Sequence, residues 1–243
     1  MALRKRRIAK ICIDGEACYI TTGYAERKYI GDPLNVSRIL SRLQSDELHL
    51  VSLSSPWNRD EDTIKFICKY TSCPLGIGGY ISTISQVDML MSFGVEKLVF
   101  GRSINDHMLL QYSSRKYGSQ AVIASADVRF SCDTNSFSVW IDHGKTMISH
   151  SLSKFLSDLP LEYIGELVIN LFDYDGLAVP RNIIDSLEAV NLPSGIPILL
   201  SCGFFYDETI VYALNKEWVS GVISSRKYSS APYSPSSVLA CFC

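Results

Sequence analysis

Short apolar runs of strand length alternate along this chain with longer segments in which apolar residues recur at helical spacing. The runs predict strands near residues 8–14, 47–53, 74–79, 97–101, 121–127, 166–173, 197–203 and 221–225. The segments between them predict helices near residues 31–44, 59–71, 83–94, 105–117, 150–158, 180–190 and 206–215. Strands that alternate with helices are typical of βα units on a parallel sheet. This pattern predicts an α/β fold, a (β/α)8 barrel.

Two insertions and the tail depart from the plain pattern. Residues 16–22, after the first strand, and residues 129–140, after the fifth, each have the pattern of a small β-hairpin. Both are expected at the catalytic mouth. The tail from residue 224 to 243 is rich in Ser, Pro and Tyr and does not favour a full eighth helix.

The ends of corresponding strands in the two halves resemble one another, which predicts a half-barrel internal repeat. The first and fifth strands end in Asp14 and Asp127, and the third and seventh end in glycines. The fourth and eighth end in Gly101-Arg102-Ser103 and Ser224-Ser225-Arg226.

Length and composition favour one barrel domain over residues 1–243, because 47% hydrophobic content is enough to bury a full core. A net charge of −2 gives no bulk attraction to nucleic acid or to an anionic membrane. Charged residues at 10, 14 and 16 interrupt any signal peptide. No apolar run approaches the roughly 20 residues that span a bilayer. We therefore expect a cytoplasmic protein.

The spacing of the cysteines and histidines does not indicate a metal site. The eight cysteines lack paired CxxC spacing, and the four histidines lie on separate elements without HxH or HxxxH spacing. No metal, nucleotide or flavin cofactor is expected.

Asp14 and Asp127 are the strongest candidates for catalysis. Each closes an apolar run that reads as a parallel strand. The ends of the first and fifth strands face each other across the mouth of a (β/α)8 barrel, so the two carboxylates are expected to form an acid/base pair. Small residues at the tops of the seventh and eighth strands are where barrels bind phosphate through backbone N–H groups.

Four motifs carry a resemblance to a known family. They are Cys12-Ile13-Asp14, Gly31-Asp32-Pro33, Tyr117-Gly118-Ser119-Gln120-Ala121-Val122 and Asp173-Tyr174-Asp175-Gly176. Over nearly its whole length the chain resembles the cyclase subunit of imidazole glycerol phosphate synthase. In that family a separate glutaminase subunit releases ammonia, which passes along the barrel axis and attacks a bisphosphorylated substrate at the opposite mouth.

The resemblance implies specific site residues. The catalytic aspartates match Asp14 and Asp127. The residues implied for substrate and phosphate binding are Asp175, Gly176, Gly203, Ser224 and Ser225 on the second half. Gly79, from the repeated strand ends, and Arg102, as a replacement contact, are the candidates on the first half. The implied partners are a glutaminase subunit in a heterodimer and a phosphorylated small molecule.

The ammonia entrance of the family is a ring of salt-bridged charges at the strand starts. Its members match Glu47, Lys97 and Glu166, with Arg7 as a fourth. Each residue begins a predicted strand, and the alternating signs favour the interpretation as a gate.

Four departures from the family pattern lie on the first half of the mouth: Thr22, Ser52, Tyr80 and Gly101-Arg102. A tyrosine ring keeps phosphate away from a backbone that glycine would expose, although Arg102 could supply a charge-assisted contact. Residues 28–35 resemble a divergent branch found with bacterial surface-polysaccharide genes, in which ammonia forms an amidine on a nucleotide-activated amino sugar. Three alternatives to the histidine-pathway cyclase therefore stay open: this amidine-forming synthase, a histidine-pathway barrel isomerase, and a non-catalytic barrel that activates a glutaminase.

Overall fold

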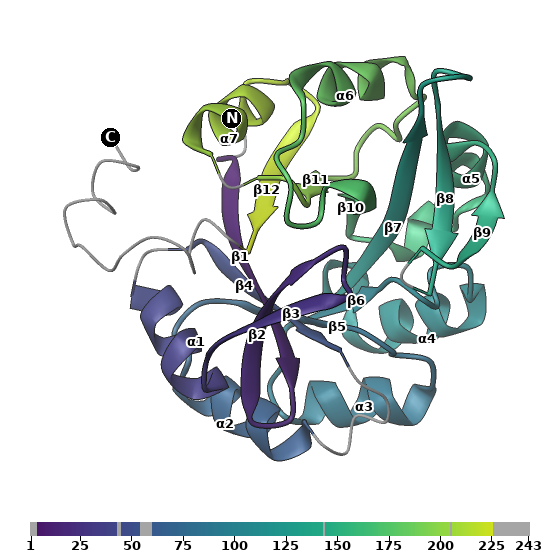
Figure 1. Ribbon diagram of the computed structural model, residues 1–243. Helices are drawn as coiled ribbons and strands as arrows, with labels where there is room; N and C mark the ends of the chain where they lie inside the picture. Colours follow the sequence, from purple (N-terminus) through teal and green to yellow (C-terminus); the bar gives the residue numbers. More distant parts are fainter. Residues whose placement is uncertain (1–3, 43–44, 54–59, 143, 205, 226–243) are drawn as a thin grey trace.

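The computed structural model describes residues 4–42, 45–53, 60–142, 144–204 and 206–225. Eight parallel strands form a closed barrel (Figure 1). In barrel order they are β1 (Arg6–Asp14), β4 (Glu47–Ser52), β5 (Leu75–Gly78), β6 (Lys97–Phe100), β7 (Val122–Ser131), β10 (Glu166–Leu171), β11 (Ile198–Ser201) and β12 (Val219–Ser224). The barrel closes because β12 pairs with β1 and β10 pairs with β7. The predicted (β/α)8 barrel is confirmed.

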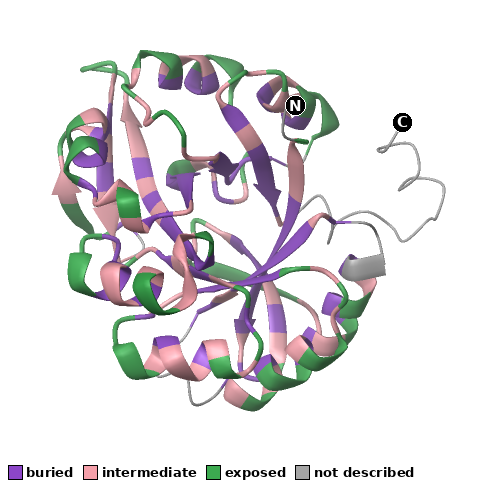
Figure 2. Cartoon of the chain, turned by 180° about the vertical axis from the view of Figure 1, so that it is seen from behind, coloured by how far each residue is buried: buried purple, intermediate pink, exposed green. Residues whose placement is uncertain are grey.

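Helices surround the strands and present their outer faces to solvent (Figure 2). They are α1 (Pro33–Arg42), α2 (Glu61–Tyr70), α3 (Ile84–Ser92), α4 (His107–Tyr117), α5 (Leu152–Asp158), α6 (Arg181–Ser186) and α7 (Asp207–Leu214). Short 3-10 turns occupy Ser119–Ala121, Leu161–Tyr163, Phe172–Tyr174 and Leu187–Ala189. The last of these splits the helix predicted over 180–190.

Local side-chain chemistry sets where these helices begin. The Thr83 and Gln86 side chains each bond the other residue's backbone N–H in a capping box that starts α3. The Asp106 side chain accepts a hydrogen bond from Leu109 N at 3.0 Å and starts α4. Pro33 is the first residue of α1, where its missing N–H costs nothing.

Both predicted hairpins are present, and each is larger than the sequence pattern indicated. After β1 come β2 (Ala17–Thr22) and β3 (Glu26–Gly31), whose dark purple ribbons cross in front of the barrel strands in Figure 1. The strand β3 was missed because its residues are mostly exposed and carry no apolar alternation. After β7 come β8 (Ser136–Ile141) and the unexpected β9 (Thr146–Ser149).

The barrel interior is layered along its axis. Side chains alternate across a strand, so Arg6, Ile8 and Lys10 of β1 all face the interior. The middle layer is a compact apolar cluster that is separate from the core between strands and helices. It contains Ile8, Ile123, Val168, Leu199 and Ile223, with Val99 packed against it. A charged layer lies at the strand starts, and a polar layer lies at the strand ends.

Part of the prediction lies outside the described residues. Of the tail, only Ser224 and Ser225 are described, so the expectation for an eighth helix is not addressed from residue 226 on. Positions 43–44 and 59 of the predicted helices also fall outside. Among the helices that are described, none has the length and apolar character needed to cross a membrane.

Candidate active site

A cavity of about 110 Å³ lies at the carboxyl ends of the barrel strands. Every barrel strand contributes to its lining, through Lys10, Val51, Gly78, Val99, Asp127, Asn170, Ser201 and Ile223. This end of a (β/α)8 barrel is where catalytic residues gather. The cavity is therefore the candidate active site.

Asp127 is the carboxylate of this cavity. Its Oδ1 accepts a hydrogen bond of 2.7 Å from Asn170 Nδ2. Burial raises the pKa of Asp127 to about 6, although the Asn170 hydrogen bond and the Lys10 charge act to lower it. A carboxyl with a pKa near 6 can both take up and release a proton close to neutral pH, which suits general acid/base catalysis.

Asp14 does not lie beside Asp127 in the cavity. The β1 strand continues past its last pairing with β4, at Ile13 and Ser52, into the tight turn that leads to β2. Asp14 lies at this turn, and its Oδ2 pairs with Arg27 Nη1 of β3 at 2.9 Å. Among the described residues, Asp14 is not part of the cavity lining. The expectation of two carboxylates facing each other is therefore corrected, because β1 extends into a hairpin before it reaches Asp14.

Lys10 occupies the cavity from the β1 side, and the sequence analysis did not single it out. It is 7% exposed. Its Nζ donates to Tyr24 Oη at 3.0 Å and approaches Cys202 Sγ at 3.5 Å. Burial acts to lower the pKa of Lys10, but the acidic groups around it, Cys202, Tyr24 and Asp175, hold that pKa well above its usual value. The side chain is therefore an ammonium at neutral pH.

Tyr24 and Asn170 connect Lys10 to Asp127. Asn170 Nδ2 donates to Tyr24 Oη at 3.1 Å as well as to Asp127. Tyr24 has a positive φ of 55°, which is uncommon for a non-glycine residue, and its ring stacks on Phe172 at 5.1 Å. Ammonium and carboxylate thus belong to one hydrogen-bonded chain across the cavity.

The Asp175 carboxylate fastens the β2–β3 hairpin over the mouth. Its Oδ2 accepts hydrogen bonds from Thr21 Oγ1 at 2.7 Å and from Tyr24 N at 2.9 Å. The backbone adds a bond of 3.0 Å from Gly23 N to Asp175 O. These contacts give Asp175 a structural task that the expected phosphate contact did not include. They also place the Tyr24 hydroxyl inside the cavity.

The residues expected to bind phosphate on the second half line one narrow pocket. Gly176, Gly203, Ser224 and Ser225 line one pocket with Asp175, as the sequence predicts, but its volume is about 20 Å³. That is room for about one water molecule. The buried Phe204 helps to fill the space, its carbonyl oxygen accepts a hydrogen bond from Ser224 Oγ, and Ser225 Oγ donates to Lys10 O at 2.9 Å.

The residues expected to bind phosphate on the first half of the barrel mouth also have other contacts in the structure. Gly79 lines the cavity, and a Cβ at this position would lie 2.3 Å from Ser52 O. Tyr80 and Arg102 line the cavity too, with the guanidinium 5.8 Å from the tyrosine ring centre. Arg102 Nε pairs with Asp142 Oδ1 at 3.0 Å. An incoming phosphate would therefore compete with Asp142 for Arg102.

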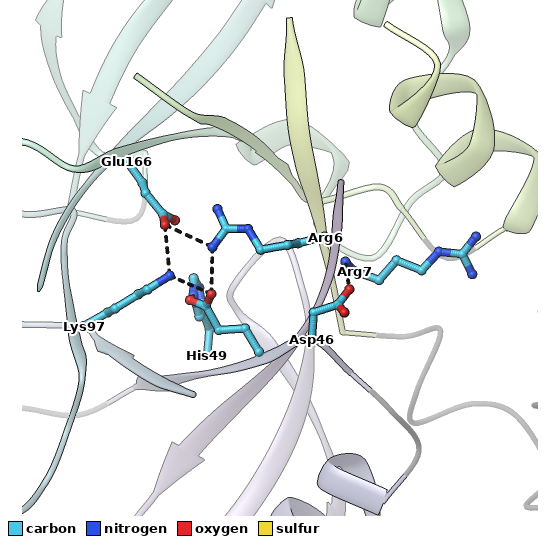
Figure 3. Close-up of polar contacts among 7 residues, drawn as sticks. Arg6, Arg7, Asp46, His49, Lys97 and Glu166 are labelled. Carbon is cyan, nitrogen blue, oxygen red and sulfur yellow. Dashed lines mark hydrogen bonds and ion pairs between the residues drawn. The ribbon is translucent and has the colours of Figure 1, made fainter. Parts of the chain in front are cut away.

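Four charged side chains form a ring at the opposite, amino-terminal end of the strands (Figure 3). Lys97 Nζ lies 2.7 Å from Glu47 Oε2 and 2.9 Å from Glu166 Oε1. Arg6 Nη1 lies 2.9 Å and 3.0 Å from the same two oxygens. The ring brings together the three strand-start charges Glu47, Lys97 and Glu166, and its fourth member is Arg6.

Arg7 was expected in the ring and is not part of it. Neighbouring residues of a strand point to opposite faces, so Arg7 extends away from the ring when Arg6 faces inward (Figure 3). The backbone N of Arg7 donates to Asp46 Oδ2 at 2.8 Å. The choice between two adjacent arginines follows from strand alternation alone.

His49 joins the ring to the cavity. Its Nε2 lies 2.6 Å from Glu47 Oε1, and its ring also lines the active-site cavity. Gly76 makes room for it, because a Cβ there would lie 2.7 Å from His49 Cδ2. Burial acts to raise the pKa of Glu47, but His49 and Lys97 lower it to about 2, so this carboxylate is ionised. Glu166 Oε2 is buried and receives no hydrogen bond from the described residues.

Residues that the sequence analysis missed follow a simple rule. Lys10 lies four residues after Arg6, and Asn170 lies four residues after Glu166, so each shares the inward face of its strand with a ring residue. Every second residue of a strand faces the same side, so counting in steps of two from Arg6 and Glu166 identifies Lys10 and Asn170. Across the described residues no cluster of three His, Cys, Asp or Glu side chains could hold a metal ion.

Comparison with known proteins agrees with this geometry. A family model described as histidine biosynthesis protein matches residues 12–229. The chain belongs to the histidine biosynthesis protein family. This assignment fits a (β/α)8 barrel with its candidate site at the strand ends.

Three relatives within the histidine biosynthesis family illustrate the range of similarity. A Prochlorococcus marinus protein named "Putative imidazole glycerol phosphate synthase subunit hisF2" is 31% identical over 213 residues, covering 83% of this chain and 81% of the relative. A Pseudomonas aeruginosa protein with the same printed name is 27% identical over 206 residues, covering 83% and 80%. The Helicobacter hepaticus imidazole glycerol phosphate synthase subunit HisF is 23% identical over 199 residues, covering 79% of each chain.

Asp127→Asn should stabilise the fold while it removes the proton-transfer group. A raised carboxyl pKa means that the folded state holds the proton more tightly than the unfolded state, so this contribution to stability is lost as pH rises through about 6. The variant should gain about 1–3 kcal/mol at pH 8, and its advantage in chemical denaturation should grow between about pH 4 and pH 7. Asp133→Asn, at an exposed aspartate of the β7–β8 turn, is the control. A constant difference across this pH range would contradict the burial of charge at Asp127.

Asp175→Ala should release the β2–β3 hairpin. Hydrogen bonds to a charged group contribute about 1.5–3 kcal/mol each, so losing two should raise the rate of tryptic cleavage after the exposed Arg27 and Lys28 by at least about tenfold. Asp173→Ala removes a nearby, 42% exposed carboxylate that pairs with Arg129, and it should leave cleavage unchanged. Equal cleavage of the two variants would show that Asp175 does not hold the hairpin.

Proposed function

We propose that this chain is the ammonia-using synthase subunit of a two-protein enzyme of the imidazole glycerol phosphate synthase type, supplied with ammonia by a glutaminase partner. The ring of Arg6, Glu47, Lys97 and Glu166 is the observation that carries the proposal. Catalysis at the strand ends does not require charges at the strand starts, and burying four charges costs free energy. A ring at the entrance to the barrel axis is explained by a molecule that enters there.

The contacts along the axis support such a route. His49 contacts Glu47 of the ring on one side and lines the cavity on the other. Val51, Val99 and Val168 continue the lining toward Asp127 with small apolar surfaces, which suit a neutral molecule better than an ion. Glu166 Oε2 offers an acceptor at the entrance for an incoming N–H group.

Asp127 supplies the proton chemistry that ammonia addition needs. When nitrogen adds to a carbonyl carbon, it has to lose protons, and the carbonyl oxygen has to gain them before it leaves as water. A carboxyl with a pKa of about 6 can carry these protons from nitrogen to oxygen. A barrel that only activates a glutaminase has no use for this cavity.

The substrate has two candidates. One is the bisphosphorylated substrate of histidine biosynthesis, which the family assignment favours. The other is a nucleotide-activated amino sugar that receives an amidine, and the geometry of the mouth favours it. The second-half cradle has room for about one water molecule, Phe204 helps to fill it, and Arg102 is paired with Asp142. Such a mouth offers little space for a substrate with a phosphate at each end, and its guanidinium is already paired.

Turnover of the two substrates with ammonium chloride separates these candidates and tests the proposal itself. Conversion of the bisphosphorylated substrate would assign the chain to the histidine pathway, and conversion of the amino sugar would assign it to amidine synthesis. If the purified chain converts neither, no ammonia-using synthase is present, and the proposal is wrong.

Lys97→Ala and Arg6→Ala should uncouple the two nitrogen sources. Each variant leaves Glu47 and Glu166 with one cation in place of two and distorts the entrance, while Asp127 lies on the far side of the apolar layer. With a saturating glutaminase subunit, glutamine-driven turnover should fall by about tenfold or more, and ammonium-driven turnover should stay within about threefold.

Arg7→Ala is the matched control, because Arg7 is adjacent in sequence but points away from the ring (Figure 3). It should keep both activities. Equal losses with glutamine and with ammonium in the ring variants would mean that the ring only stabilises the barrel, and the case for a glutaminase partner would lose its support.

A further inference from the structure

The buried ammonium of Lys10 has no role in the function proposed so far. A buried charge loses its hydration, and the groups around it have to compensate for that loss. Its hydrogen-bond partners are the Tyr24 hydroxyl and the Cys202 thiol, and the Asp175 carboxylate also acts to raise its pKa, although the two form no ion pair among the described residues. Methionine or leucine would fill the same space without a charge to desolvate. The fold alone therefore does not explain this lysine.

The position of Lys10 relative to Asp127 indicates what it does. Both line the same cavity, from strands β1 and β7 on opposite sides of the barrel. The chain through Tyr24 and Asn170 keeps them no more than three hydrogen bonds apart. A cation and a carboxylate are thus available on two sides of one bound molecule.

We propose that Lys10 is a catalytic residue that binds the carbonyl oxygen of the substrate and stabilises the negative charge that develops on it when ammonia adds, while Asp127 moves the protons. The inference rests on the ammonia-using function proposed above. It assigns to a lysine and an aspartate the task that two aspartates were expected to share. The substrate class is any molecule with a ketone or amide carbonyl at the reacting carbon.

The bond changes follow directly. The nitrogen lone pair of ammonia forms the new C–N bond, and the C=O π electrons move to oxygen, where the Lys10 ammonium stabilises the charge. The Asp127 carboxylate takes one proton from nitrogen and gives it to that oxygen, which yields a carbinolamine. A second transfer from nitrogen to oxygen through Asp127 releases water and leaves C=N. Lys10 keeps its proton throughout, and Asp127 returns to its starting form.

Tyr24 is a positioning residue in this scheme. Its hydroxyl accepts from Lys10 and from Asn170, and burial raises the pKa of the phenol well above its usual value, so the hydroxyl stays neutral. It reaches the cavity only because Asp175 fastens the hairpin. Closing of the hairpin and alignment of the ammonium are therefore linked.

Lys10→Met tests the proposal, since it keeps a side chain of similar length and removes the charge. With ammonium chloride and the substrate that the wild type converts, kcat should fall by about 10²–10³ while the KM for substrate stays within about threefold. Lys10→Arg should recover part of the loss, because it restores a cation. Lys69→Met, at an exposed lysine of α2, should match the wild type.

The pH profile supplies a readout that a purely structural role would not change. Lys10 acts to lower the pKa of Asp127, which is about 6, so Lys10→Met should move the acidic limb of the ammonium-driven rate to higher pH. This limb is measured at constant free ammonia. Melting curves of Lys10→Met and of the wild type are recorded at the assay pH, so that kcat is compared between folded proteins.

The outcomes separate the two proposals. A wild type that converts neither candidate substrate refutes the ammonia-using function, and this inference falls with it. An active wild type whose Lys10→Met variant keeps kcat within a few-fold refutes the role of Lys10 alone. A rise in KM at unchanged kcat also refutes it, because the ammonium would then bind substrate without stabilising the transition state. If Lys10→Met does not fold, Lys10→Arg and Lys10→Gln carry the same comparison.

Discussion

The apolar layer in the middle of the barrel is the constraint on which the rest of this molecule depends. Ile8, Ile123, Val168, Leu199 and Ile223 separate a charged ring at one end of the strands from a polar cavity at the other. Ionised side chains are too costly to place in an apolar layer, so the ionised groups at each end of the barrel have to find their partners at that same end. The ring does so with two carboxylates and two cations. The cavity does so with hydrogen bonds, and among the described residues this leaves Lys10 and Asp127 without direct ion pairs and available to a bound molecule.

The two antiparallel hairpins follow from the same closed geometry. Eight strands fill the barrel wall, so a strand that runs past the rim can pair only with added strands, as β1 does with β2 and β7 with β8. The first hairpin folds back across the mouth and is fastened to the second half by Asp175. A loop that would otherwise connect strand to helix thereby contributes Tyr24 to the cavity.

Sequence periodicity was sufficient for the barrel, and the same rule explains where the site prediction succeeded and failed. The strands that begin with Glu47, Lys97 and Glu166 were correctly placed, so their charges meet in the structure. The fourth member was assigned one residue late, which reverses the face of the strand and selects Arg7 in place of Arg6. Asp14 has the inward parity, but it lies beyond the rim. Parity gives the face of a strand, whereas only the lengths of the neighbouring strands give the height along the axis. That length information is absent from a single strand's pattern.

The features that sequence could not supply are those that depend on contacts between distant elements. The pairing of Asp175 with the β2–β3 hairpin joins residues 151 and 154 positions apart in sequence, and neither partner carries a local signal for the other. The second-half cradle is narrow, and the space beside Gly203 is taken by Val179 and Tyr174, which follow a different strand. The first feature closes the active-site cavity from above, and the second limits the volume of the pocket that Gly176, Gly203, Ser224 and Ser225 line. The family's scaffold and a charged ring at the strand starts are thus combined here with a mouth whose charge, volume and closure differ from the expected pattern, and a reaction proposed for that mouth has to be consistent with a buried lysine.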